Sequence, residues 1–468
     1  MNALRAYRTL FVGTLVQESF LSVGGADDPA TTVDSPFCRD GKGRPTLRGS
    51  GLAGALVATL RRMNAGNVPV EISGSQNGRV PSVWRFFNSH PLEIGGKEPM
   101  PAFRQHVAID ARTGAAATGA LFDLETLPPA TYWPFLLEVD TSRFAEGADL
   151  ARAALMHWVH GRCLLGREVA RGMGWMRLDG LCEYTLTTDH IDFWPNAETY
   201  DDYHCYIRKT FSTCGKLRPK DANDAAFATL PGWIELEGAV HAGQRTDDVG
   251  KGYGIDSLSI GGHATEELAA AWDGCYLAPD GMTADAAKAA FDPDFAVVGW
   301  SKGNQRVPYI PGSSLRGPLR HEWRRLLRAQ AGCPSAATST RTVDEMVNAL
   351  FGTTESSARL LLCDALPVDG SDIKLAWQQH HAEDEFAGST YKSAKFDRVA
   401  VMQGSFRWRM ILEDATETEM TALAGLLELG AQGQLGIGGG QWRGHGWLRW
   451  QCDQLDRLDP TTSRGASS

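Results

Sequence analysis

Residues 47–62 have the sequence LRGSGLAGALVATLRR, and residues 310–325 have the related sequence IPGSSLRGPLRHEWRR, 263 positions further on. The two stretches agree at seven of sixteen positions, including a Gly-Ser pair and a closing Arg-Arg pair. A second pair of motifs follows in the same order, RGMGWMR at residues 171–177 and RGHGWLR at residues 443–449. Two unlike motifs that recur in one order at nearly one offset indicate a tandem duplication. The chain is therefore predicted to hold two copies of one domain.

Composition narrows the class of protein. The chain has 468 residues, 43% of them apolar, and a net charge of −10. It has no apolar run of the ~18 residues that a membrane span needs, and its first residues lack the pattern of a signal peptide. Its nine cysteines are scattered and odd in number, which favours a reducing compartment over a disulfide framework. We expect a cytoplasmic protein with no membrane partner, and the net charge argues against nucleic-acid binding over its whole surface.

Basic residues nevertheless concentrate around the repeated motif in both halves. A solvated helix face explains either cluster taken alone, but recurrence with the duplication favours a surface that faces phosphates. The predicted RNA-binding residues in these clusters are Arg39, Lys42, Arg44 and Arg48 in the first half, and Lys302, Arg306 and Arg316 in the second.

The order of predicted elements is the same in each half. Strand-like segments at residues 7–17 and 233–241 precede basic helices that are predicted to begin near Leu52 and near Pro318. The second start is placed there because proline suits the first position of a helix. Apolar β segments at residues 121–140 and 398–414 lead to amphipathic helices at about 148–165 and 417–429, the latter with a Thr416/Glu419 capping box. This order predicts an α+β fold of two tandem ferredoxin-like (RRM-type) domains with insertions. The predicted boundaries are residues 1–184 and 232–457 for the domains, 185–231 for a linker, 264–292 for a helical insertion and 458–468 for a disordered tail.

The repeated motifs suggest anion binding. GSGLAG and GSSLRG place small residues and free N–H groups at a helix start, so Ser50, Ser313 and Ser314 are candidate phosphate contacts. The alternative is an ordinary capped helix whose glycines allow close packing. Arg171 and Arg443 in the RG-x-G loops are further candidates, whereas Trp175 and Trp447 are expected in the core. Neither loop completes a dinucleotide fingerprint, and the chain has no P-loop.

Signatures of metal or nucleophilic sites are few. His204, Cys205 and Cys214 could contribute to a zinc site, although no C-x-x-C, H-E-x-x-H or G-x-S-x-G motif occurs. Asp34 lies in a polar loop fourteen residues before Arg48. A carboxylate among cations could ligate a divalent metal or accept a proton from a ribose hydroxyl. The alternative is a simple turn residue.

The segment VDSPFCRDGKGRPTLRGSGLAGAL at residues 33–56 resembles the signature of RAMP superfamily backbone subunits of type III CRISPR effector complexes. VAIDARTGAAATGALFDLETLPPATYWPF at residues 107–135 is similar to the thumb hairpin of that family. The second half matches in IPGSSLRGPL, FGTTESSARLLLCDA and QLGIGGGQWRGHG but departs at the thumb and at the catalytic loop. Two such domains in one chain resemble the fused subunits of type III-D and related complexes.

This resemblance implies domains with thumb hairpins that hold a guide RNA (crRNA) and cut complementary target RNA. It implies that Asp34 is catalytic and binds Mg²⁺ (or Mn²⁺). Asp294 is the candidate in the second half, three residues further from its helix motif than Asp34, with Asp256 as a rival. The implied partners are guide RNA, target RNA and other effector subunits: the large subunit, other RAMP subunits and the small subunit. Two alternatives stay open, a non-catalytic scaffold and a guide-processing ribonuclease that uses His106, His190 or His204.

Overall fold

The computed structural model describes residues 6–25, 33–75, 78–96, 98–109, 116–187, 229–243, 257–263, 272, 276–277, 282–302, 305–332, 341–353, 355–381, 383–384, 389–390 and 395–459. It divides into two compact units, Met1–Val169 with Met173–Trp233, and Ala170–Gly172 with Ile234–Ser468. In the described part of the chain, no helix is both long and apolar enough to cross a membrane.

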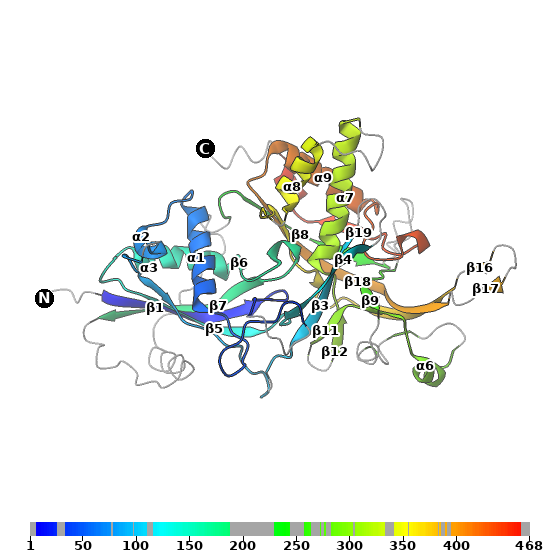
Figure 1. Cartoon of the computed structure of the whole chain (residues 1–468), viewed down its shortest axis with the longest axis horizontal. Coiled ribbons are helices and arrows are strands. Elements are labelled where there is room, and N and C mark those ends of the chain that lie inside the picture. The colour runs from blue at the N-terminus through cyan, green and yellow to red at the C-terminus, as the bar shows by residue number, and fades with distance from the viewer. Residues whose placement is uncertain are drawn as a thin grey trace. The chain divides into compact units, whose positions relative to one another are not determined.

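The first unit is built on an antiparallel sheet with two helices on one face (Figure 1). Its main elements are β1 (Ala6–Gln17), α1 (Gly49–Met63), β2 (Trp84–Phe86), β5 (Tyr132–Val139), α3 (Gly147–Val159) and β7 (Trp175–Thr187), with the shorter α2 (Val70–Ser73) and β6 (Cys163–Leu164). The short helix η1 (Val169–Arg171) falls at the boundary between the residue ranges of the two units. The strands lie in the order β2-β5-β1-β7-β6. If β1, β2, β5 and β7 are taken as the four strands that define the fold, this is the strand order of a ferredoxin-like fold.

The alternation of apolar residues explains why β1 lies at the centre of this sheet. Phe11 and Leu15 belong to the cluster that the helices cover, which also contains Leu52 and Leu56 of α1. Leu10, one position away, belongs to a second cluster on the other face. Successive side chains of a strand point to opposite faces, so β1 buries apolar surface on both.

The second unit repeats this plan. The four strands that define its fold are β8 (Trp233–Ala242), β13 (Leu360–Leu362), β18 (Phe396–Glu413) and β19 (Arg449–Cys452). Its large helices are α7 (Gly312–Gln330), α8 (Arg341–Phe351) and α9 (Glu417–Ala431). β19 pairs with β8, β8 lies beside β18, and β13 pairs with β18, so the strand order matches that of the first unit. Smaller elements are β9 (Gly261–His263), α6 (Ala284–Ala290), β10 (Phe295–Val297), β11 (Gly299–Lys302), β12 (Gln305–Pro308), β14 (Leu366–Pro367), η4 (Gln441–Arg443) and η5 (Leu455–Leu458).

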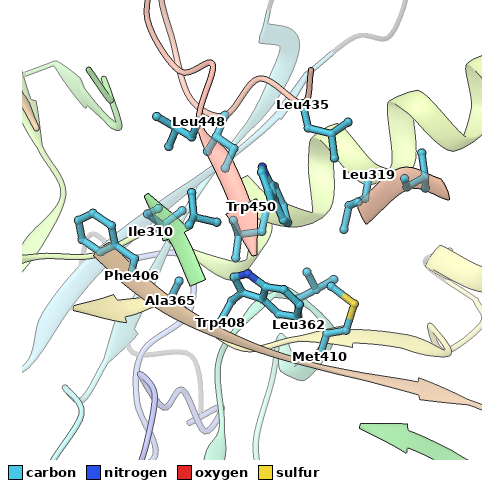
Figure 2. Close-up of a cluster of buried hydrophobic side chains, with 14 of the residues drawn as sticks. Ile310, Leu319, Leu362, Ala365, Phe406, Trp408, Met410, Leu435, Leu448 and Trp450 are labelled. Atoms are coloured by element: carbon cyan, nitrogen blue, oxygen red, sulfur yellow. The ribbon is translucent and has the colours of Figure 1, made fainter. Parts of the chain in front are cut away.

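Aromatic side chains fill the core of the second unit. Figure 2 shows Trp408 of β18 and Trp450 of β19 beside Leu319 of α7. The two indole rings lie 6.3 Å apart, and both side chains are fully buried. Leu319 occupies the same motif position as Leu56 in the first core, so each copy of the motif uses this leucine to fix its helix on its sheet.

Each unit extends a long hairpin from its sheet. In the first unit β3 (Ala102–Ile109) pairs with β4 (Ala116–Thr126), and in the second β15 (Lys374–His380) pairs with the first part of β18. Short strands β16 (Glu383–Asp384) and β17 (Ser389–Thr390) pair further out along the second hairpin. The chain is 28% helix and 36% strand with antiparallel sheets, which confirms the predicted α+β fold of two ferredoxin-like halves.

The structure corrects two details of the predicted elements. The motif helices begin at Gly49 and Gly312 rather than near Leu52 and Pro318, so Pro318 lies inside α7. The earlier start is stabilised because a distant side chain accepts the first N–H of each helix, as described below. Leu458, assigned to the tail, is 1% exposed and packs in the second core. Most of the predicted linker and insertion lies outside the described residues, as do residues 460–468, while α6 falls within the insertion.

Candidate functional site

Asp34 lies in a loop that runs beside β4, at the base of the first hairpin. Ser35 forms a parallel bridge with Leu124, and the N–H of Glu125 donates to the carbonyl of Ser35. The Asp34 carboxylate accepts the backbone N–H of Asp123 at 3.0 Å. Asp34 is exposed, so the hairpin holds this carboxylate in place while leaving it open to a ligand.

Asp294 has the same arrangement in the second unit. Its carboxylate accepts the backbone N–H of Asp397 at 2.7 Å, and the next residue, Phe295, bridges Arg398 in parallel. Asp294 is also exposed. The structure therefore makes Asp294 the counterpart of Asp34, although their distances along the chain to the helix motif differ. The rival Asp256 lies outside the described residues.

A stacked histidine–phenylalanine pair lies across each hairpin, with the phenylalanine one residue before the aspartate that donates its N–H. The sequence alone did not indicate this pair. His106 lies opposite Phe122 with ring centroids 5.1 Å apart, and His380 lies opposite Phe396 at 5.0 Å, both stacked. Each histidine stands 17 residues before the aspartate whose N–H binds the exposed carboxylate. The spacing from the histidine to the Phe-Asp pair is the same in both halves and could have identified these residues, but the sequences between them differ.

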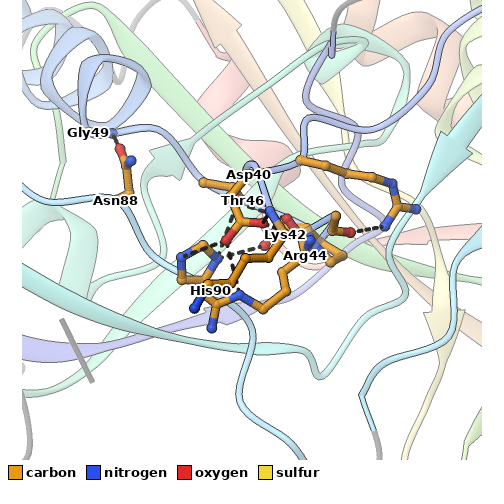
Figure 3. Close-up of polar contacts among 10 residues, drawn as sticks. Asp40, Lys42, Arg44, Thr46, Gly49, Asn88 and His90 are labelled. Atoms are coloured by element: carbon orange, nitrogen blue, oxygen red, sulfur yellow. Dashed lines mark hydrogen bonds and ion pairs between the residues drawn. The ribbon is translucent and has the colours of Figure 1, made fainter. Parts of the chain in front are cut away.

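A short basic loop follows Asp34 and is organised by Asp40 (Figure 3). The Asp40 carboxylate accepts the N–H groups of Lys42 at 2.8 Å and Arg44 at 2.9 Å, and also the Nε of Arg44 at 3.0 Å. The hydrogen bond from the Arg44 backbone is the main cause that lowers the pKa of Asp40 to about 2. Arg39 forms an ion pair with the buried Glu125 of β4. Lys42 is exposed at the loop tip and is the residue here best placed to meet a phosphate.

The first residue of each motif helix donates its N–H to a side chain of the same unit and packs closely against a neighbouring strand. Figure 3 shows the N–H of Gly49 donating to Oδ1 of Asn88 at 2.9 Å. In the second unit the N–H of Gly312 donates to the carboxylate of Asp364 at 2.8 Å. A Cβ at Gly49 would lie 2.6 Å from the Phe86 carbonyl oxygen, and one at Gly312 would lie 2.8 Å from that of Leu362. This first N–H is therefore not available to a phosphate, and the glycines serve close packing.

The remaining predicted contacts divide between surface and interior. Arg316 is 8% exposed, donates to the carbonyl of Phe351 and lies over its ring. It is held inside the unit, which gives no support to the prediction that it contacts RNA. Arg306 is half-buried, donates to the Gly299 carbonyl at 3.1 Å and lies over Trp272, while the Lys302 side chain is outside the described part. Arg48 and Ser50 are exposed at the start of α1, and Ser313 and Ser314 are half-buried in the first turn of α7.

The glycine-rich loops differ between the units. Arg171 is half-buried at the end of η1, whereas Arg443 at the end of η4 is exposed. Trp175 is fully buried, as expected, but Trp447 is 38% exposed, and the neighbouring Trp442 is completely exposed. Trp442 offers a flat aromatic face next to Arg443, a combination that suits an unstacked base beside its phosphate.

No group of three or more metal-binding side chains occurs among the described residues. The possible zinc residues His204, Cys205 and Cys214 lie outside them. A lone exposed carboxylate such as Asp34 or Asp294 still fits Mg²⁺, which keeps several waters and is often held by one or two carboxylates together with substrate phosphates.

Comparison with known proteins agrees with the duplicated geometry. No curated protein matches the chain with significant similarity. The profile of the RAMP superfamily matches residues 18–177 and again residues 298–449, about two thirds of the chain. The first match contains Asp34, and Asp294 stands just before the second. Each match covers one motif helix and one glycine-rich loop. The chain therefore belongs to the RAMP superfamily, as a CRISPR-associated RNA-binding protein with two RAMP domains.

Proposed function

We propose that this protein is a guide-binding backbone subunit of a type III CRISPR ribonucleoprotein and that it cleaves complementary target RNA at two sites, using Asp34 and Asp294. The observation that carries the proposal is the repeated geometry at the base of each hairpin, where an exposed carboxylate is fixed by the N–H of Asp123 or Asp397. A turn residue would have no reason to keep this contact in both units across a changed loop length.

The expected reaction is an attack by the ribose 2′-oxygen on the adjacent phosphorus, with the bond to the 5′-oxygen breaking. The products are a 2′,3′-cyclic phosphate and a 5′-hydroxyl, which takes its proton from water. An ionised carboxylate can accept the 2′-hydroxyl proton directly or through water. Bound Mg²⁺ or Mn²⁺ would stabilise the charge that develops on the phosphate oxygens. DNA lacks the 2′-hydroxyl, so a DNA target would bind without being cut.

The proposed partners are guide RNA, target RNA and the other effector subunits, namely the large subunit, further RAMP subunits and the small subunit. Lys42, Arg48 and Arg443 are exposed cations near the duplicated motifs and would meet the RNA backbone. The chain is acidic as a whole, which suits protein contacts on its other faces, in a complex that works in the cytoplasm.

The test is a cleavage ladder on labelled target RNA with the assembled complex. Asp34→Asn should remove one cut, Asp294→Asn a second, and the double variant both, with target affinity retained. Asp149→Asn, an exposed carboxylate on α3, is the matched control. A deoxyribose at one scissile position should block that cut alone, and chelation should block all.

An unchanged ladder for both aspartate variants would leave the scaffold alternative. The guide-processing alternative needs an accessible histidine. His106 is buried and stacked on Phe122, which does not favour such a role, and His190 and His204 are outside the described residues. Cleavage of free repeat RNA by the isolated chain would support that alternative instead.

A further inference from the structure

Two arginines and one histidine lie against the ring of Phe396 in the second unit, and a second histidine lies against the first. The guanidinium of Arg443 lies 4.7 Å from the ring centroid and that of Arg398 lies 5.2 Å from it. His380 stacks on the same ring, and His445 meets His380 edge-on at 5.5 Å. The site comprises Arg398, Arg443, His380, His445 and Phe396, and we call it the Phe396 cluster.

Arg398 is the unusual member of the Phe396 cluster. It is 6% exposed, yet among the described residues only one oxygen, Oγ of Ser259, accepts a hydrogen bond from its guanidinium, at 2.8 Å. Its Nε is buried and has no hydrogen-bond partner among those residues. In the part of the chain that the structure describes, neither Arg398 nor Arg443 forms an ion pair with a carboxylate. Some half-buried arginines have a carboxylate partner, as Arg152 has Glu183 and Arg359 has Glu419, whereas Arg306 and Arg316 donate to backbone carbonyls.

This arrangement is electrostatically unfavourable without an anion. A buried charge is costly unless it is paired, and a second cation beside it adds to the cost. Burial is the main cause that lowers the pKa of Arg398, followed by Arg443. Burial and then Arg398 also lower the pKa of His445 to about 4, and the same two causes lower the pKa of His380. Both histidines are therefore neutral at pH 7, and two fixed positive charges remain.

We propose that Arg398 and Arg443 form a phosphodiester-binding site in the second unit. Guanidinium groups bind phosphate oxygens through paired, charge-assisted hydrogen bonds, and Phe396 holds the two groups by cation–π contact. The site is next to Asp294, because Asp397, which precedes Arg398, donates its N–H to that carboxylate. The proposal deepens the proposed function and rests on it for the origin of the phosphate, a guide or a target strand.

The first unit places its residues differently: the buried Arg104 lies on the facing strand, opposite Leu124. Leu124 follows Asp123 as Arg398 follows Asp397, and Met173 takes the place of His445 in the RG-x-G motif. Leu124 and Met173 are both buried. The two units therefore present the same carboxylate geometry, but the residue that follows the N–H donor is apolar in the first unit and an arginine in the second.

The chemistry can be tested on the full chain with inorganic phosphate as the probe, by following the imidazole signals of His380 and His445 in NMR. Phosphate should raise the pKa of both histidines, since an anion offsets the arginine charge. Arg398→Met and Arg443→Gln should each abolish this response. Arg407→Met, an exposed arginine of the same strand β18, is the matched control. Arg398→Met should also raise the melting temperature without phosphate, because it removes an unpaired buried charge.

A histidine response that survives both substitutions, or that Arg407→Met also removes, would overturn the site. The origin of the phosphate is found by replacing single linkages of guide or target RNA with neutral methylphosphonates. At one linkage, the wild-type complex should lose affinity about tenfold or more, the size expected for a hydrogen bond to a charged group, and Arg398→Met should lose nothing further. A scan with no such linkage in either strand contradicts the proposal. Asp294→Asn should remove its cut and keep the phosphate response, so failure of cleavage and failure of this site are separable.

Discussion

At the scale of single residues, Asp40 sets the shape of the basic loop beside Asp34. Its lowered pKa means that the folded loop stabilises the ionised carboxylate, so this stabilisation is present above the ordinary pKa of 3.8 and is lost as the pH falls through about 2. We expect the amide signals of Lys42 and Arg44 to stay at their neutral-pH positions down to about pH 3, and to move only below it. Asp40→Asn should shift both at all pH values. Movement of the wild-type signals near pH 4 would contradict this.

At the scale of elements, the glycine that begins each motif helix fixes how close the helix approaches its sheet. Gly49→Ala would place a Cβ against the Phe86 carbonyl oxygen and force α1 outward, which should cost about 1–3 kcal/mol of unfolding free energy. Gly54→Ala in the same helix meets nothing within 4 Å and should stabilise by about 0.5–1 kcal/mol. Denaturant unfolding of both variants checks this, and equal effects would show that α1 can shift freely.

The same elements show what sequence could and could not predict. The repeated motif identified α1 and α7 and their buried leucines, because a core face recurs with the duplication. It did not reveal which basic residues point inward, so Arg316 was assigned to the surface. Asp294 was predicted as the candidate of the second half, but with Asp256 as a rival, because the segment before its helix is three residues longer and forms the β11–β12 hairpin. The Phe396 cluster joins residues from three separate segments, and only the fold brings them together.

At the scale of the whole molecule, each unit buries a core of its own, so the chain should unfold in two transitions rather than one. Leu56 and Leu319 hold the same motif position, and both are fully buried. Leu56→Ala should lower the transition temperature of the first unit only, and Leu319→Ala that of the second unit only. Each should reduce the unfolding free energy of its unit by about 2–5 kcal/mol, the cost of a core cavity. Differential scanning calorimetry of the two variants and their double variant measures this. A single transition that both substitutions lower equally would show that the units fold as one body, and the two cleavage sites would then be lost together on heating.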